Sequence, residues 1–170
     1  VDEGRASSIA SIRFTGNRTF ESEDLLDMMQ LGTPNWMSWY TKRDLYSREK
    51  LAADLETIRS FYMNQGYLDF KIDSVQVSIA SNKSDVYIAI NLTEGEKYTI
   101  SGVKLQGDML GLDKDLEALI TIKPGEIYNA ESVKNVSTAI TDKLSTLGYA
   151  FASANPNPIA DANARTVEIV

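Results

Sequence analysis

The sequence contains neither cysteine nor histidine. Their absence excludes thiol nucleophiles, disulfide bonds and most zinc sites, and it removes the usual general base near neutral pH. No segment approaches the roughly 18 consecutive apolar residues that a membrane-spanning helix needs. Basic residues are also few, 17 against 24 acidic ones, and the net charge of −7 opposes a general attraction to nucleic acid or anionic lipid. We therefore expect no nucleic-acid partner, no metal and no cofactor.

The residues that are present indicate a folded chain built from a repeat. Apolar residues make up 43% and charged residues 24%, which are ordinary globular values. Glu3-Gly4 precedes Gly16 by the same interval that separates Glu94-Gly95 from Gly107. We therefore predict two homologous domains, residues 5–95 and 96–170, after the tail of an earlier copy at residues 1–4. Residues 165–170 alternate like a strand and stop without a turn, so we expect the last strand to be cut short.

Periodicity predicts the order β-α-α-β-β in each copy, because apolar alternation marks strands and apolar residues three or four apart mark helices. In the first copy we expect strands at 8–15, 68–79 and 86–92, and helices at 21–29 and 47–65. In the second copy we expect a strand at 98–105, helices at 113–120 and 130–147, and a hairpin at 150–170. This order predicts an α+β fold in which two helices cover one face of a three-stranded sheet.

The predicted strand at 68–79 changes phase halfway along. Its apolar residues stand at even positions up to Ile72 and at odd positions from Val75 onward. Side chains on a strand alternate between its two faces, so one extra residue must be absorbed near Asp73 and Ser74. This pattern predicts a β-bulge, a feature that is common at sheet edges. The first strand of each copy shows a similar shift of one residue.

The connections place this bulged strand at an edge of its sheet. A short turn at 81–85 joins it to the third strand, so these two strands pair antiparallel. Two helices separate the first strand from the second, which is enough chain to place the first strand beyond the third. We therefore predict a central third strand and an edge strand guarded by the polar residues Asp69, Lys71 and Asp73. In the second copy, residues 150–154 show no strong alternation of apolar and polar residues, and we expect this domain to act as a spacer.

Several runs of the sequence are similar to a known family. They are FTGN at 14–17, LAADLETIRS at 51–60, IDSVQVS at 72–78, NLTEG at 91–95 and KPGEIYN at 123–129. In these runs and in its tandem β-α-α-β-β order, the chain resembles the POTRA domains of the Omp85 family of outer-membrane β-barrel assembly factors. The resemblance covers essentially the whole chain, and the order of motifs is similar to that of the third and fourth POTRA domains of such factors.

The resemblance implies a non-enzymatic scaffold in the periplasm of a Gram-negative bacterium, part of an outer-membrane protein whose barrel lies elsewhere in the full chain. It implies that the array docks accessory lipoproteins of the assembly machine, including the β-propeller lipoprotein BamB, and receives unfolded outer-membrane proteins by β-strand addition. Carried over to this sequence, it points to Asp73, Val77 and Ile79 for the lipoprotein contact. We expect the partner-binding edge strand to comprise Asp73, Val75, Gln76, Val77, Ser78 and Ile79. One of these, Val75, stands where the family pattern leads us to expect a threonine.

Trp36, Trp39 and Tyr40 lie between the two helices of the first copy, together with Met37. We expect them to cover the core beneath this long connection, and an accessory binding patch is the alternative. The acidic pair Asp54 and Glu56, like the pair at 113 and 115, is expected on a solvated helix face, because no adjacent base or metal cluster accompanies it.

Two other functions compete with the scaffold interpretation. A β-α-α-β unit can also belong to an RNA-binding KH module, but that module needs a Gly-x-x-Gly clamp and a basic face, and neither is present. POTRA arrays of other transporters or of division proteins remain the nearest alternative.

Overall fold

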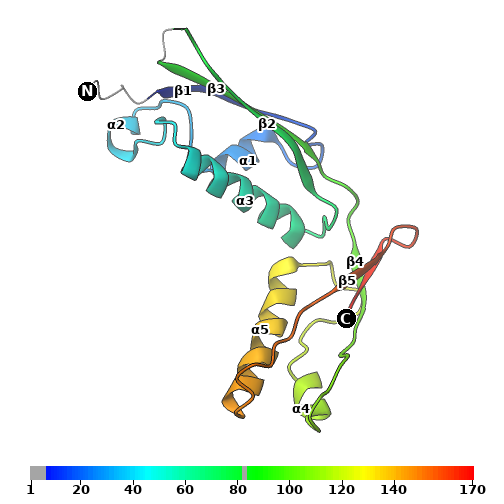
Figure 1. The fold of residues 1–170 in the computed structure, drawn as a ribbon. Coiled ribbons are helices and arrows are strands. Elements are labelled where there is room, and N and C mark those ends of the chain that lie inside the picture. Colours follow the sequence, from blue (N-terminus) through cyan, green and yellow to red (C-terminus); the bar gives the residue numbers. More distant parts are fainter. Residues whose placement is uncertain (1–6, 82–83) are drawn as a thin grey trace. The chain divides into compact units, whose positions relative to one another are not determined.

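The computed structural model describes residues 7–81 and 84–170 (Figure 1). The expected tail at 1–4 and two residues of the expected turn, Asn82 and Lys83, lie outside the described residues. The chain divides into two compact units, which are described separately. Residues up to Phe61 and Asp69–Gly95 form the first unit, and Tyr62–Leu68 with Glu96–Val170 form the second.

The first unit is a three-stranded sheet with its helices on one face, as Figure 1 shows. Its elements are β1 (Ser8–Thr15), α1 (Ser22–Asp27), α2 (Ser38–Thr41), α3 (Arg48–Asn64), β2 (Lys71–Ile79) and β3 (Asp85–Thr93). The strand order is β1-β3-β2, with β1 parallel and β2 antiparallel to β3. This confirms the predicted central third strand and the predicted edge position of β2.

The second unit repeats the same topology. Its elements are β4 (Thr99–Val103), α4 (Asp113–Glu117), α5 (Ala130–Thr146), β5 (Pro158–Asp161) and β6 (Thr166–Ile169). The sheet order is β4-β6-β5, again with a parallel first pair and an antiparallel second pair. The expected hairpin starts later than predicted, because its first arm begins at Pro158 rather than near residue 150. The α+β fold of two tandem β-α-α-β-β repeats is confirmed.

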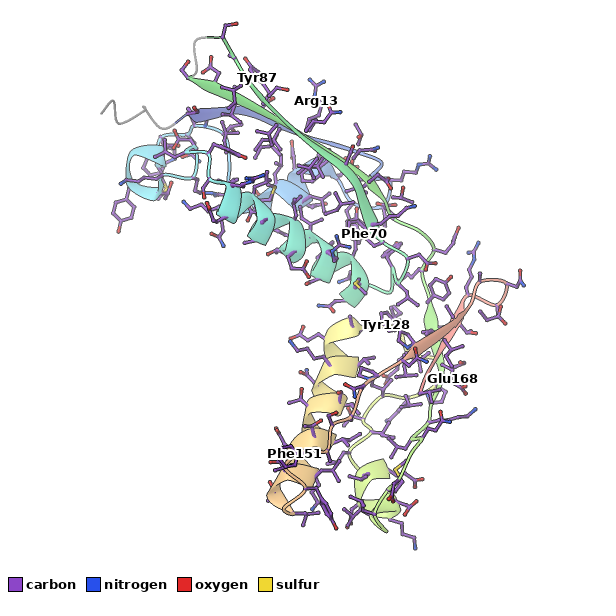
Figure 2. All side chains as sticks on the ribbon, in the orientation of Figure 1. Arg13, Phe70, Tyr87, Tyr128, Phe151 and Glu168 are labelled. Carbon is purple, nitrogen blue, oxygen red and sulfur yellow. The ribbon has the colours of Figure 1, made fainter. Side chains whose placement is uncertain are left out.

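The core of the first unit forms between β3 and the helices. The alternate residues Val86, Ile88, Ile90 and Leu92 of β3 are all at most 2% exposed. On the side of α3 that belongs to this unit, Leu51 and Ile58 are buried, and Leu55 beside them is half-buried. Figure 2 shows Tyr87 and Arg13 on the opposite face of the sheet, which carries no helix. The predicted alternation of β3 between core and solvent is therefore confirmed.

All three predicted bulges are present. The register shifts between Ile9 and Ser11 in β1, between Ile72 and Ser74 in β2, and between Ile100 and Gly102 in β4. The predicted start of the second strand at residue 68 is wrong, because residues 68–69 form a turn and β2 begins at Lys71. Phe70, just before β2, is instead 5% exposed in the core.

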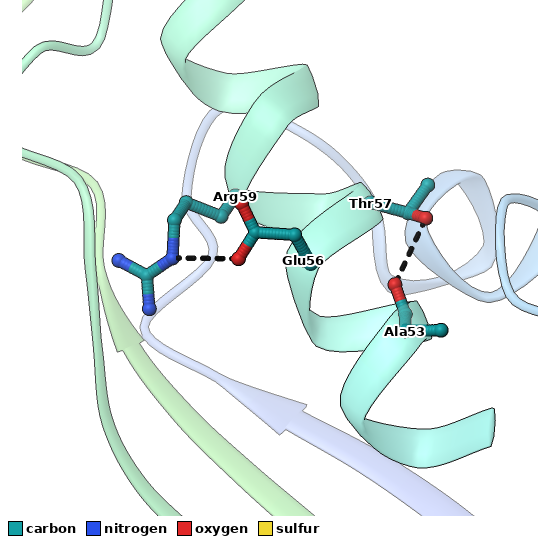
Figure 3. Close-up of polar contacts among 4 residues, drawn as sticks. All are labelled: Ala53, Glu56, Thr57 and Arg59. Atoms are coloured by element: carbon teal, nitrogen blue, oxygen red, sulfur yellow. Dashed lines mark hydrogen bonds and ion pairs between the residues drawn. The ribbon is translucent and has the colours of Figure 1, made fainter. Parts of the chain in front are cut away.

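The expected solvated position of Asp54 is also wrong. This carboxylate is 1% exposed, and it accepts hydrogen bonds from the backbone N–H groups of Gln30 at 2.7 Å and Leu31 at 3.0 Å. It thereby fixes the chain that leaves α1. Glu56 does lie on the solvated face of α3, where its carboxylate is 3.5 Å from Arg59 Nε (Figure 3).

A second buried carboxylate explains the Glu-Gly and Gly-Asn motifs of the repeat. Glu94 is 8% exposed, and its oxygens accept hydrogen bonds from the backbone N–H groups of Arg18 and Thr19 and from the Thr19 hydroxyl, at 2.9–3.0 Å. The loop that it holds begins at Gly16, whose φ is +93°. A Cβ atom at Gly16 would lie 1.8 Å from the carbonyl oxygen of Leu92, so only glycine fits there.

Candidate binding edge

The free edge of β2 presents the backbone groups of its apolar residues. Opposed residues in an antiparallel pair alternate between hydrogen-bonded and non-hydrogen-bonded pairs. Ala80 N donates to Asp85 O at 2.9 Å, which makes this a hydrogen-bonded pair, and the register is unbroken from there to Ser74. By this alternation Ser78, Gln76 and Ser74 bond to β3. The N–H and C=O groups of Val75, Val77 and Ile79 therefore point away from the sheet.

The side chains of these three residues lie on the same face as the core. Val75, Val77 and Ile79 stand opposite the buried residues Ile90, Ile88 and Val86 of β3. They nevertheless remain 36%, 37% and 57% exposed, so their position on the core face does not bury them. The edge therefore combines outward backbone groups with a partly exposed row of β-branched apolar side chains.

The other three predicted contact residues occupy different positions. Gln76 and Ser78 stand opposite Ala89 and Tyr87, so their side chains lie on the helix-free face of the sheet. Asp73 is the extra residue of the bulge. Its carboxylate accepts a hydrogen bond from Thr93 Oγ1 at 2.6 Å and is 3.8 Å from Lys71 Nζ. The six residues thus share one strand but divide between its two faces, and Asp73 holds the bulge.

The first strands are covered at the start of their outer edges. In the first unit Ser8 bridges to Leu45, Ile9 N donates to Asp44 O and Tyr46 N donates to Ser7 O. In the second unit Thr99 bridges to Ile127, and residues 98–100 exchange hydrogen bonds with residues 125–128. The segment before the long helix therefore closes the start of that edge in both repeats, and β2 and β5 form the opposite edges of the two sheets.

The edge of β5 is much less available than that of β2. β5 has four residues against nine in β2. Asn157 and Val170 exchange both backbone hydrogen bonds, so by the same alternation Pro158 and Ala160 face outward. Proline has no N–H group to donate, which is how natural edge strands are protected from pairing. Sequence reasoning missed this protection, although Pro158 itself was a visible signal.

The aromatic residues near α2 do not cover the core, so that expectation is wrong. Trp36 is 83% exposed, Tyr40 75% and Met37 41%. The side chain of Trp39 lies outside the described part of the structure. The exposed side chains form a second apolar feature of the first unit, separate from the β2 edge in sequence.

A cavity of about 270 Å³ lies in the second unit, between α5 and the ends of β4 and β6. Its lining is largely apolar and contains no carboxylate among the described residues. Its one lysine, Lys104, places Nζ 2.6 Å from the Glu168 carboxylate. The lining therefore offers no pair of groups for proton transfer. Within residues 7–81 and 84–170, no group of three or more acidic residues could hold a metal ion.

The fold and the β2 edge together define a class of protein: a tandem array of small α+β modules with an edge strand open for pairing. Within the described residues, no helix is long and apolar enough to cross a membrane. The model of the POTRA family, described as surface antigen variable number repeat, matches residues 7–95 and 98–170. The chain belongs to the POTRA family.

Known proteins with similar sequences are assembly factors. The chain is 30% identical to the outer membrane protein assembly factor BamA of Neisseria meningitidis serogroup B over all of its length, and 30% identical to BamA of Buchnera aphidicola over 99%. It spans only 22% and 27% of these two relatives. The crystal structure of POTRA domains 3–5 of Haemophilus influenzae BamA matches with a TM-score of 0.82 and 27% identity, covering 96% of this chain and 64% of that one. Neither these names nor the cavity indicate an enzymatic activity.

Proposed function

We propose that the chain is a periplasmic scaffold module of an outer-membrane protein assembly machine, and that it binds polypeptide by adding a strand to the edge of β2. The observation that carries this proposal is the coincidence, at Val75, Val77 and Ile79, of outward backbone groups and exposed apolar side chains. Strand addition uses these two elements: backbone hydrogen bonds supply affinity, and alternate side chains supply specificity.

Two kinds of partner fit this edge. One is an unfolded outer-membrane protein, whose alternating strands can place apolar side chains beside Val75, Val77 and Ile79. The other is an accessory lipoprotein such as the β-propeller lipoprotein BamB, which can offer a strand or loop to the same groups. The similarity to BamA, an outer membrane protein assembly factor, supports the first kind of partner, and it supports assigning the two repeats as third and fourth POTRA domains in a Gram-negative periplasm. We further propose the domain limits 5–95 and 96–170.

The geometry predicts weak, reversible binding. Three outward residues can form up to six backbone hydrogen bonds, each with a net contribution of about 0.5–1.5 kcal/mol, or about 3–9 kcal/mol together. Association costs roughly 4–15 kcal/mol in lost freedom, so backbone pairing alone leaves little surplus. Contacts with the apolar row must supply the rest. Weak binding suits a scaffold for protein assembly, because the polypeptide that it binds must be released again.

Residue-resolved hydrogen exchange tests this model directly. We expect a peptide with alternating apolar and polar residues to slow exchange at the amides of Val75, Val77 and Ile79. The amides of Gln76 and Ser78 already bond to β3, so their exchange should change far less. Peptide binding that protects other amides and leaves these three unchanged would contradict strand addition at β2.

Two proline variants separate the β2 edge from the β5 edge. Val77→Pro removes an outward N–H group, so it should abolish peptide binding while the β2–β3 hydrogen bonds remain. Ala160→Pro is the matched control, because it makes the same change at an outward position of β5 and should leave binding intact. Ile79→Asp should weaken binding by placing a charge in the apolar row. Equal peptide affinity in wild type and Val77→Pro would overturn the proposal, provided that the variant's circular dichroism matches wild type.

A further inference from the structure

The connection between α1 and α3 is a loop closed at its base. Gly32 N donates to Arg43 O at 2.9 Å. The Arg43 guanidinium donates to the carbonyl oxygens of Met29 at 2.9 Å and Gln30 at 3.2 Å. Residues 32–43 therefore leave the domain and return to it at one point. This is the geometry of a compact surface loop, a type of segment that is frequently functional.

The tip of this loop is also ordered by its own hydrogen bonds. Asn35 N donates to Ser38 Oγ at 2.7 Å, and Met37 N donates to Asn35 Oδ1 at 2.9 Å. The helical turn of α2 then ends at Lys42, whose N–H donates to Ser38 O at 2.9 Å. These hydrogen bonds hold the loop in a fixed shape, and the side chains of Trp36 and Tyr40 are exposed to solvent. The corresponding connection in the second repeat carries no tryptophan.

The charges around the tip differ from those of the whole chain. The chain has a net charge of −7, yet residues 28–43 contain no acidic residue and two basic ones, Lys42 and Arg43. Arg43 is held at the base of the loop, whereas Lys42 is exposed next to α2. Charges farther away than about 8–10 Å are largely screened at physiological ionic strength, so the surroundings of the tip decide what it attracts.

We propose that the tip of loop 32–43 docks on the surface of a phospholipid bilayer, with Trp36, Met37 and Tyr40 in the interfacial layer and Lys42 at the head-group phosphates. Tryptophan and tyrosine favour this layer because their rings are apolar and their N–H and O–H groups can still reach water. A protein hot spot, by contrast, sits in a packed patch whose neighbours exclude water. Here the aromatic side chains protrude at 75–83% exposure. This inference goes beyond strand addition and does not depend on it.

The chain is well suited to the test because its only two tryptophans, Trp36 and Trp39, both belong to this loop. Tryptophan fluorescence of the full chain is measured as mixed phosphatidylethanolamine–phosphatidylglycerol vesicles are added, with phosphatidylcholine vesicles as the comparison. We expect a blue shift of the emission and quenching by lipids brominated near the head group. Co-flotation with the vesicles provides a second measurement that does not rely on fluorescence.

Variants identify the groups responsible. Trp36→Ser combined with Tyr40→Ser should abolish co-flotation, whereas Phe151→Ser should not, although it removes a fully exposed aromatic side chain from the second unit (Figure 2). Lys42→Gln should lower partitioning onto the anionic vesicles about fivefold, since one basic residue near such a surface contributes about 1 kcal/mol. Absence of vesicle binding by the wild type, or equal loss in the Phe151 control, would overturn the proposal. Val77→Pro should leave vesicle binding unchanged, which separates this test from that of strand addition.

Discussion

Replacing Asp54 with alanine should strongly destabilise the first unit, because this carboxylate is the buried partner of two backbone amides. It is 1% exposed and lies 2.7 Å from Gln30 N and 3.0 Å from Leu31 N. In the alanine variant both N–H groups lose their acceptor. The chain that leaves α1, which also forms the base of loop 32–43, loses its attachment to α3.

The magnitude follows from the two bonds. A buried donor left without a partner costs about 1–3 kcal/mol, and a bond to a charged group contributes about 1.5–3 kcal/mol. Two such donors set the expected loss at about 3–5 kcal/mol, against a total stability of roughly 5–15 kcal/mol for a typical domain. Asp54→Asn keeps one acceptor oxygen but turns an NH₂ group toward the other amide, so its expected loss is about 2 kcal/mol.

Glu56→Ala is the matched control, because it removes a carboxylate two residues away on the exposed face of the same helix. That carboxylate pairs only across the surface with Arg59, an interaction worth about 0–1 kcal/mol. Urea unfolding should be followed through the amide resonances of β3, which report on the first unit, and the dependence on urea should keep its slope. A loss below about 1 kcal/mol for Asp54→Ala would refute the assignment of this carboxylate as a buried anchor.

Two further predictions concern glycine and tyrosine. Gly16→Ala should lower the free energy of unfolding in urea far more than Gly107→Ala. Both glycines have positive φ, but only a Cβ at Gly16 meets a backbone atom, the carbonyl oxygen of Leu92. Equal losses would show that the positive φ alone sets the cost of the substitution. Burial raises the pKa of Tyr128, so folding favours its neutral form and its contribution to stability is lost as the pH rises above the ordinary tyrosine value of about 10. The free energy of unfolding of Tyr128→Phe should therefore fall less than that of wild type in alkaline solution, and identical pH dependence would contradict this.

The topology and the bulges could be predicted from the sequence because local patterns of residues indicate them. A bulge changes the parity of the apolar residues, and the shift from Ile72 to Val75 locates the extra residue at Asp73 without any tertiary information. The order of strands follows from the length of the connections. The repeat also helped to predict the helices and strands, because a pattern that is weak in one copy is supported by its counterpart in the other.

The burial of particular side chains could not be predicted in the same way. Asp54 and Glu56 look alike in the sequence, and only the packing of the loop at 30–31 against one side of α3 separates them. The segment around Trp36 and Tyr40 has the composition of a core segment, but these two side chains are exposed in a loop that contains the helical turn Ser38–Thr41 and is closed at its base by Arg43. Which backbone groups of β2 face outward likewise follows from the pairing of β2 with β3, and the bond from Ala80 N to Asp85 O identifies the hydrogen-bonded pairs.

The two repeats illustrate how one fold acquires different surfaces. Both close the start of the first strand's outer edge with the segment before the long helix, and in both the second strand forms the opposite edge of the sheet. In the first unit that edge is nine residues long, and three β-branched residues direct their backbone N–H and C=O groups outward. In the second unit it is four residues long and begins with a proline at an outward position. The two edges therefore differ in length, in the side chains on the core face and in the number of outward N–H groups, since Pro158 and Ala160 of β5 stand where β2 has β-branched residues. These are the differences expected if one module receives strands and the other is kept from pairing.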